Sequence, residues 1–354
     1  MRIGITPPGL DRASLDFVVE AERLGVDSVW VPEAWMYDAL TPLGYLAART
    51  ERLRLASAVV QLGARSPAML AMSALALHTL SGGRFILGVG TSGPQVMEGW
   101  HGVRFDRPVT RTSETIDIIR TVVAGDRLVY EGDVHTLPLP GGQGRALRSP
   151  VGGPDVDIPI HIASLGPRNL RLTGAKADGW IGTAFMPESA DVFLEPIAEG
   201  AAEAGRDPAG IELSVAAGLE FTDDPESAGR RHASGYAFTI GAMGSSSTNF
   251  YNQVFARQGF ADAVAEVRAL WESGDRERAA AAVPIEIGLR TNLIGDDESV
   301  RERLRRYRNC GIDTLRVNVV GEPGSNANDH HPRLDALARL VDLATAVEAE
   351  AEAP

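Results

Sequence analysis

Eight short apolar segments alternate with helical segments along almost the whole of this sequence. The segments between them place apolar residues on one helix face, as at Leu15, Val18 and Val19. Strands that alternate with helices form parallel sheets, because each helix returns the chain to the start of the next strand. The expected strands are Arg2–Thr6, Ser28–Glu33, Leu53–Gln61, Phe85–Gly90, Ile158–Ser164, Gly179–Thr183, Ile211–Phe221 and Asp313–Val320.

A turn near the start of the chain recurs near its end. Leu24–Val29 (LGVDSV) matches Cys310–Leu315 (CGIDTL) in residue type at nearly every position. Each copy is typical of a glycine that ends a helix before a strand begins. Eight such units predict an α/β fold of the closed (β/α)8 TIM barrel type, formed as a single domain over residues 1–354. A doubly wound open sheet is the alternative that the same alternation allows.

Two segments are longer than a bare barrel needs, and we expect them to be insertions. The first, at about 127–158, follows the fourth strand and combines a hairpin pattern with a loop rich in proline and glycine. The second, at about 234–283, follows the seventh strand and is mostly helical, with a tip at Gly244–Ser247. Such insertions form lids, substrate pockets or subunit contacts, or decorate the surface.

The composition argues against several classes of protein. The net charge of −13, from 47 acidic and 34 basic residues, disfavours nucleic acid as a partner, because such binding neutralises phosphates. No apolar run approaches the roughly 20 residues of a membrane helix, and the first residues are typical of a strand rather than a signal peptide. The single Cys310 and the spacing of the histidines predict no disulfide and no metal site. We expect a cytoplasmic enzyme that acts on a small molecule.

The fourth strand ends in a glycine-rich segment, Gly88–Gly93 (GVGTSG), which fits the G-x-G-x-x-G pattern of dinucleotide-binding folds. However, Pro94 stands where the helix of that fold would open, and no acidic residue ends a following strand about 20 residues on. We therefore expect these glycines to let a flat ring or another backbone segment approach closely.

Polar residues follow five of the expected strands, namely Glu33, Gln61, Thr91 with Ser92, Ser164 and Thr183. In a barrel these strand ends share one rim, where barrel enzymes bind their ligands. The set contains no metal-binding group and no nucleophile–base pair, and Ser164 lacks the glycine of a hydrolase elbow two positions earlier. We therefore expect a bound cofactor to supply the chemistry.

The segment that begins at Ser164 has the features of a phosphate site. It leads through Gly166 and Pro167 into a helix, whose first N–H groups and dipole favour an anion. The same residues also fit an ordinary serine cap, so this pattern alone leaves both interpretations open.

Two side chains near the rim are candidates for proton transfer. Glu33 lies between aromatic residues, where a carboxyl group can have a raised pKa; the alternative is a surface or helix-capping glutamate. His101, in a loop after the fourth strand, is the histidine best placed for catalysis. By contrast, His78 and His161 lie inside a helix and a strand and are expected to be structural.

Three long segments resemble the bacterial luciferase-like monooxygenase superfamily: SGGRFILGVGTSGPQVMEGWHG, RTSETIDIIR and IASLGPRNLRLTGAKADGWIG. The similarity extends from SVWVPEAW to the final GIDTLRV and includes NFYNQVFARQGF. The sequence is most similar to the branch that uses the deazaflavin coenzyme F420. This resemblance implies a (β/α)8 barrel, usually a homodimer, with the ring system held at the carboxyl ends of the strands.

The resemblance also implies roles for individual residues. A bulge in the third strand, often with a non-proline cis peptide, would fall at Ala58–Val59 and lie behind the ring. Gln61 would lie near the polar edge of the ring, and Glu33 matches an acidic residue near it. The positions that hold the phosphate-bearing side chain of the cofactor are matched by Ser164, Leu165, Gly166 and Thr183.

The sequence departs from the sugar-phosphate dehydrogenases of this family. The histidine that follows their acidic residue is Ala34 here, and their phosphate-binding lysine falls near the apolar Met186. Their glutamate proton donor falls near Ser92 or Gly93. The resemblance therefore does not extend to glucose-6-phosphate oxidation, and Glu33 and His101 remain the candidate proton donors.

We therefore expect an F420-dependent oxidoreductase that transfers a hydride between the deazaflavin C5 and a small organic substrate. The alternative within the family is an FMN-dependent monooxygenase that works with a separate flavin reductase. A non-catalytic flavin-binding protein is a third alternative, which the polar residues at five strand ends argue against.

Overall fold

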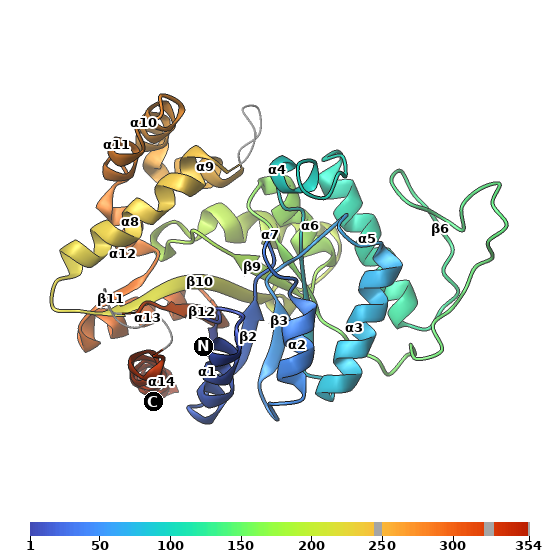
Figure 1. Ribbon diagram of the computed structural model, residues 1–354, viewed down its shortest axis with the longest axis horizontal. Coiled ribbons are helices and arrows are strands. Elements are labelled where there is room, and N and C mark those ends of the chain that lie inside the picture. The colour runs from blue at the N-terminus through green and yellow to red at the C-terminus, as the bar shows by residue number, and fades with distance from the viewer. Residues whose placement is uncertain (244–249, 322–328, 353–354) are drawn as a thin grey trace.

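The eight expected strands pair side by side into one closed ring in the computed structural model, which describes residues 1–243, 250–321 and 329–352 (Figure 1). All pairs in the ring are parallel, and β12 closes it by pairing with β1 on one side and β10 on the other. The fold is therefore a (β/α)8 barrel, and the open-sheet alternative is wrong. Its strands are β1 (Arg2–Ile5), β2 (Ser28–Val31), β3 (Arg54–Ser57) with β4 (Val60–Gln61), β5 (Phe85–Gly90), β8 (Ile160–Ala163), β9 (Gly179–Gly182), β10 (Glu212–Phe221) and β12 (Thr314–Val319).

Helices surround the ring and bury their apolar faces against it. The repeated turn ends two of them in the same way: Gly25 and Gly311 have φ angles of 91° and 81°, which favour glycine. Each turn is followed after two residues by a strand, β2 or β12, so the repeated unit is confirmed. The barrel helices are α1 (Arg12–Arg23), α2 (Leu40–Ala47), α3 (Pro67–Ser81), α5 (Pro108–Val123), α6 (Pro167–Lys176), α7 (Asp191–Glu203), α13 (Asp297–Asn309) and α14 (His331–Glu352).

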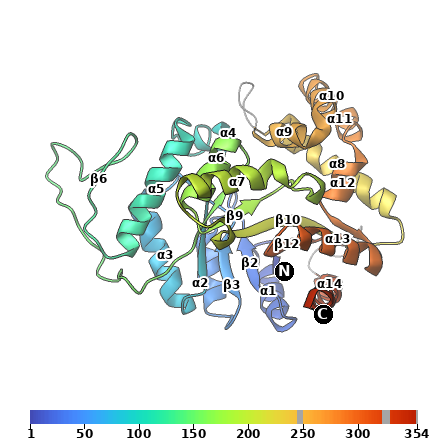
Figure 2. The same cartoon turned by 180° about the vertical axis from the view of Figure 1, so that it is seen from behind.

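The segment after β5 and α5 forms an arm that projects from the barrel in both views (Figures 1 and 2). It contains the antiparallel pair β6 (Tyr130–Glu131) and β7 (Thr136–Leu137). Three short helices also lie in connections: α4 (Pro94–Met97), η1 (Pro187–Ser189) and η2 (Pro208–Gly210). The start of α4 at Pro94 corrects one sequence argument, because proline fits the first turn of a helix and does not prevent it from opening.

The segment after β10 is longer than expected and lies on the side of the barrel opposite the arm (Figures 1 and 2). Its first helix begins before residue 234 and its last strand, which pairs with β10, ends after residue 283. The expected tip at Gly244–Ser247 lies outside the described residues. The elements are α8 (Pro225–Gly241), α9 (Phe250–Phe255), η3 (Ala256–Phe260), α10 (Ala261–Glu272), α11 (Arg276–Ala281), α12 (Ile285–Arg290) and β11 (Leu293–Gly295).

The interior of the barrel contains an apolar cluster of its own, formed by Trp30, Ala56, Ile86 and Ile181. At the amino-terminal ends of the strands, Arg54 forms ion pairs with Asp27 at 2.8 Å and Glu212 at 3.0 Å. Burial raises the pKa of Glu212, but its hydrogen bonds with Arg54 and nearby positive charges outweigh burial and lower it to about 2. This cluster of charges occupies the amino-terminal end, which leaves the carboxyl ends for ligands.

No helix in the described part of the chain is both long enough and apolar enough to cross a membrane.

Candidate active site

The predicted site residues lie on one continuous arc of the barrel rim. Their strands are neighbours in the ring, in the order β2, β3 with β4, β5, β8 and β9. Residues far apart in the sequence are therefore adjacent at the carboxyl ends. Across residues 1–243, 250–321 and 329–352, no group of three or more His, Cys, Asp or Glu side chains is arranged to hold a metal ion.

A bulge interrupts the third strand between β3 and β4, and the peptide bond Ala58–Val59 within it is cis. The Ser57 hydroxyl spans the interruption: it donates to the carbonyl oxygen of Gly88 at 2.8 Å and accepts from the Gly88 N–H at 2.9 Å. A Cβ atom on Gly88 would lie 1.8 Å from the Ser57 carbonyl oxygen, and one on Gly90 would lie 2.6 Å from Val59 Cγ2. The glycines of β5 thus admit the bulge, as the close-approach interpretation predicted.

Gln61 and His101 form a hydrogen-bonded network with the end of β2. Gln61 donates from Nε2 to the carbonyl oxygens of Ala34, at 2.9 Å, and Glu33, at 3.4 Å. Its Oε1 lies 2.6 Å from His101 Nε2. Because Gln61 is only 3% exposed, these contacts hold its amide in one orientation.

That orientation determines the tautomer of His101. The Gln61 amide nitrogen is committed to two carbonyl groups, so the amide oxygen faces the imidazole, and this oxygen can only accept. His101 therefore carries a proton on Nε2, and in the neutral ring Nδ1 is the acceptor. A half-buried histidine fixed in one tautomer at the rim is well arranged to move a proton at Nδ1.

Glu33 lies in the same network but is held in a bidentate ion pair. Its two oxygens accept from Arg65 Nη1 at 2.7 Å and Nη2 at 2.8 Å. They also accept from the backbone N–H groups of Ala39, at 3.0 Å, and Gln61, at 3.3 Å. Four donors on a carboxylate that is 6% exposed favour an orienting role over the proton exchange suggested by the sequence. Sequence reasoning missed Arg65, because the pairing of two loops requires knowledge of their distance.

The chain after β5 and β9 adopts unusual backbone conformations at the rim. Ser92 and Ala184 have φ angles of 56° and 53°, a left-handed region that side chains with a Cβ disfavour. Each directly follows a predicted cofactor residue, Thr91 or Thr183. Residues held in this region are typical of ligand-binding loops.

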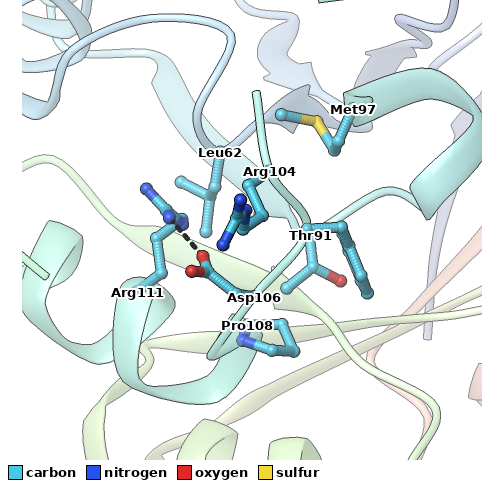
Figure 3. Close-up of a pocket in the computed structure, with 8 residues that line it drawn as sticks. Leu62, Thr91, Met97, Arg104, Asp106, Pro108 and Arg111 are labelled. Atoms are coloured by element: carbon cyan, nitrogen blue, oxygen red, sulfur yellow. Dashed lines mark hydrogen bonds and ion pairs between the residues drawn. The ribbon is translucent and has the colours of Figure 1, made fainter. Parts of the chain in front are cut away.

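Thr91 also borders a hollow of about 10 Å³, which is enough for about one water molecule (Figure 3). Asp106 and Arg111 form an ion pair of 2.9 Å at this hollow. Its other lining residues are Leu62, Met97, Arg104, Phe105 and Pro108.

The start of α6 combines a helix N-terminus with a nearby cation. No side chain among the described residues caps the helix at Gly166. The Ser164 hydroxyl is buried and bonded to Thr173 at 2.8 Å, so an anion here would meet backbone groups rather than this side chain. Arg257, which sequence reasoning missed, reaches from η3 and donates to the carbonyl oxygen of Leu165. The buried Asn169 Oδ1 has no partner in the described structure.

Comparison with known proteins identifies the family. The sequence model of the family described as luciferase-like monooxygenase matches residues 7–314. The chain belongs to this family. A protein of Mycobacterium tuberculosis named as a coenzyme F420-dependent oxidoreductase is 39% identical over 326 residues, which cover 90% of this chain and 92% of that protein. Within the luciferase-like family, the chain therefore falls in the F420-dependent branch of oxidoreductases.

Two further proteins named as F420-dependent are similar over nearly their full length. The F420-dependent glucose-6-phosphate dehydrogenase of Nocardia farcinica is 27% identical and is covered to 95%, with 92% of this chain. The coenzyme F420-dependent tetrahydromethanopterin reductase of Methanopyrus kandleri has the same fold, with a TM-score of 0.75, 22% identity and 96% coverage of each chain.

One departure within the luciferase-like family is explained by packing. Met186, near the position of the phosphate-binding lysine expected in sugar-phosphate dehydrogenases, is 1% exposed and belongs to the main core. Its backbone N–H donates to the buried Gln258 side chain at 3.1 Å. A side chain at this position therefore faces the core and does not reach a ligand at the rim.

Proposed function

We propose that this protein is a coenzyme F420-dependent oxidoreductase that exchanges a hydride with a small organic substrate. The observation that supports this proposal most directly is the Gln61–His101 pair, 2.6 Å apart, beside the Ala58–Val59 bulge. This pair places hydrogen-bonding groups of fixed orientation next to a surface on which a flat ring would rest. The relationship to proteins named for F420 supports the choice of cofactor.

The residues present fit such a cofactor. The bulge at Ala58–Val59, half-buried and next to the glycines of β5, would support the ring face. The uncapped start of α6 and Arg257 would hold the negatively charged side chain of the cofactor through N–H groups, the helix dipole and a guanidinium. Thr91, Ser92 and Thr183 would bound the space between these two parts.

Bound F420 would supply or accept a hydride at C5. A carbonyl, imine or activated alkene that gains a hydride also gains one proton, so two electrons and two hydrogens are transferred in all. We assign His101 to deliver that proton from Nδ1, which first takes it up from solvent, because Gln61 holds the Nε2–H group and leaves this other ring nitrogen for exchange. Glu33 acts indirectly. Its carboxylate accepts the backbone N–H of Gln61 and pairs with Arg65, which fixes the position of Gln61.

The rim also presents exposed aromatic side chains. Trp35 and Trp100 follow β2 and β5 and are 48% and 66% exposed. Exposed aromatic surface next to a polar network favours an apolar organic substrate that brings one polar group to His101.

The test is a fluorescence titration of the purified protein with F420, with FMN in parallel. Tight binding of F420 and not of FMN is expected, followed by substrate-dependent oxidation of reduced F420 under nitrogen. Preference for FMN, together with oxygen consumption in the presence of a flavin reductase, would overturn the proposal in favour of the monooxygenase alternative.

We also propose that two copies of the chain associate through α3 and the arm. The 15 residues of α3 contain no acidic or basic side chain apart from His78, and Met69, Met72 and Leu80 on its outer face are 50–65% exposed. A helix that is apolar on all sides is normally buried. Between α3 and the arm lies an apolar cavity of about 820 Å³.

The distribution of charge favours a second copy as the occupant of this cavity. The chain carries 47 acidic residues, yet Glu51 is the one acidic residue between positions 39 and 97, which include α2 and α3. Two copies with a net charge of −13 each therefore bring few carboxylates together where α2 and α3 form this face. A two-fold dimer uses the same patch on both copies, so this patch needs to be complementary only to itself.

A further inference from the structure

Arg316, in the middle of β12, places a guanidinium inside the barrel. The residue is 5% exposed, and its Cζ lies 5.2 Å from the centroid of the Trp30 ring. Its Nη2 donates to the carbonyl oxygen of Gly182 at 2.5 Å. Because Gly182 is the last residue of β9 and precedes Thr183, the guanidinium reaches the carboxyl end of that strand.

This cation has no ionic partner in the described part of the chain. Arg316 forms no ion pair within 4.0 Å there, and its buried Nε has no hydrogen-bond partner. Arg54, at the amino-terminal end of the barrel, differs from Arg316 because two carboxylates bind its guanidinium. A buried charge without a counter-charge is costly, so the folded protein contains an electrostatic imbalance that a ligand can correct.

The neighbouring groups do not neutralise it. Gly4 on β1 and Ala216 on β10 flank Arg316 in the sheet and are uncharged. His161 on β8 also contacts the Trp30 ring, and burial lowers its pKa to about 4, so this histidine is neutral near pH 7. Burial also lowers the pKa of Arg316, to about 9, which leaves it protonated at that pH.

The charged and titratable groups at the rim and at the amino-terminal end are engaged elsewhere or lie outside the barrel interior. Those at the amino-terminal end are Arg2, Asp27, Arg54 and Glu212, which bind one another. Those at the rim include the Glu33–Arg65 pair, His101, Arg257 and, at the end of β10, Glu220, whose carboxylate pairs with Arg231 and His232. Arg316, by contrast, lies against the interior cluster itself, through its contact with the Trp30 ring.

That cluster connects Arg316 to the proposed cofactor surface. Trp30 packs in one apolar group with Ala56, Ile86 and Ile181, and Ala58 and Val59 of the bulge pack against the same group. The cation is therefore separated by one layer of side chains from the surface on which a ring would rest. In a layer with few polar atoms, a charge acts over such a distance with little screening.

We propose that Arg316 is the counter-cation that draws an anionic form of the cofactor ring into the site. The inference rests on the proposed function, since it takes the ligand to be F420, whose hydroxyl-bearing ring becomes an anion when it loses a proton. Binding of the protonated ring then releases that proton to solvent, and the bound ring ionises at a lower pH than the free ring. Arg316 is a positioning residue in this proposal, because it acts through the Trp30 layer rather than by contact.

The experiment compares the wild type with Arg316→Met and Arg316→Lys by absorbance titration of bound F420 between pH 5 and 9. We expect the ring pKa in the wild-type complex to be lower than that of free F420 by about one unit, which is tenfold in affinity for the anion. Arg316→Met should abolish this difference and weaken binding about tenfold above the ring pKa. Arg316→Lys should retain part of it.

The thermal midpoint of the protein without cofactor provides a second readout. Arg316→Met should leave it unchanged or raise it, because the substitution removes an unpaired buried charge. Arg54→Met is the matched control: it removes a paired arginine, so the midpoint should fall while the ring pKa stays at the wild-type value.

The outcomes separate the two proposals. Wild-type binding of F420 with the same ring pKa in Arg316→Met overturns the counter-cation and leaves the proposed function intact. A large fall in the thermal midpoint of Arg316→Met also overturns it, because Arg316 is then structural. Wild-type protein that binds FMN and not F420 overturns the proposed function, and the counter-cation for the F420 ring with it.

Discussion

His101 donates from Nε2 to the amide oxygen of Gln61 across 2.6 Å, so a loop residue after β5 is oriented by the last residue of β4. Neither side chain alone determines where the proton lies. Two carbonyl groups orient Gln61, Gln61 orients His101, and the proton-accepting nitrogen of the imidazole follows from this order. This relay gives a physical reason to assign proton transfer to His101 rather than to Glu33.

Replacement of His101 by phenylalanine should reduce turnover by about 10²- to 10⁴-fold, the usual range for loss of a general acid. F420 affinity should change little, since the ring contacts are assigned to other residues. Steady-state kinetics and fluorescence titration measure the two quantities. His331→Phe, at an exposed position on α14, is the control and should behave as the wild type. Full turnover in His101→Phe would exclude His101 as the proton donor.

Glu33→Gln should destabilise the protein by about 3 kcal/mol, because Arg65 loses its bidentate carboxylate in a mostly buried setting. The free energy of unfolding in denaturant measures this change. Glu20→Gln, in an exposed pair with Arg23, should change it by less than about 0.5 kcal/mol. Equal effects of the two substitutions would contradict the structural role assigned to Glu33.

Gly88→Ala should prevent normal folding or cost at least about 3 kcal/mol, because the new Cβ would overlap the Ser57 carbonyl oxygen, and backbone cannot easily yield. Gly93→Ala is the control, since its Cβ would meet only the end of the Gln95 side chain, at 3.6 Å. Circular dichroism and thermal melting compare the two. Normal stability of Gly88→Ala would show that the bulge does not press on β5.

Acid should destabilise the protein partly through His161. Burial lowers its pKa from 6.5 to about 4, so between these values the unfolded chain binds a proton that the folded chain does not. The free energy of unfolding should therefore fall as the pH falls through this window, by up to about 3 kcal/mol from this group. His161→Leu should flatten the pH dependence between pH 6.5 and 4. An unchanged slope in the variant would mean that His161 is not buried in its neutral form.

Met72→Glu should convert the proposed dimer to monomer, because it puts a carboxylate on the apolar face of α3. Light scattering coupled to gel filtration measures the mass. Phe238→Glu, at a similarly exposed apolar residue of α8, should leave the dimer intact. A wild-type monomer, or a dimer that survives Met72→Glu, would exclude this interface.

The barrel could be predicted because its signals are local. The glycine stop at Gly25 and its copy at Gly311 each lie within a few residues of the strand they introduce. The strand β11 was missed because its three residues are specified by pairing with β10, about 70 positions earlier.

The site could be predicted only as far as its signals are local. Strand ends placed Gln61 and Thr183 at the rim, but the contacts that give Gln61 its meaning come from other loops. Arg65 and Arg316 were invisible as site residues for the same reason. The sequence contains many arginines, and whether one of them has a carboxylate partner among the described residues depends on contacts that only the structure shows.

Ser57 has a consequence for how this barrel can change. Its hydroxyl donates one hydrogen bond to Gly88 and accepts another from it, as a peptide group of a neighbouring strand would. This one side chain therefore replaces the backbone hydrogen bonds that the bulge removes. Alanine at this position would leave two backbone groups of β5 unsatisfied in a dry environment, whereas threonine keeps both functions. The bulge in the third strand is therefore compatible with a fully hydrogen-bonded β5 only if position 57 carries serine or threonine.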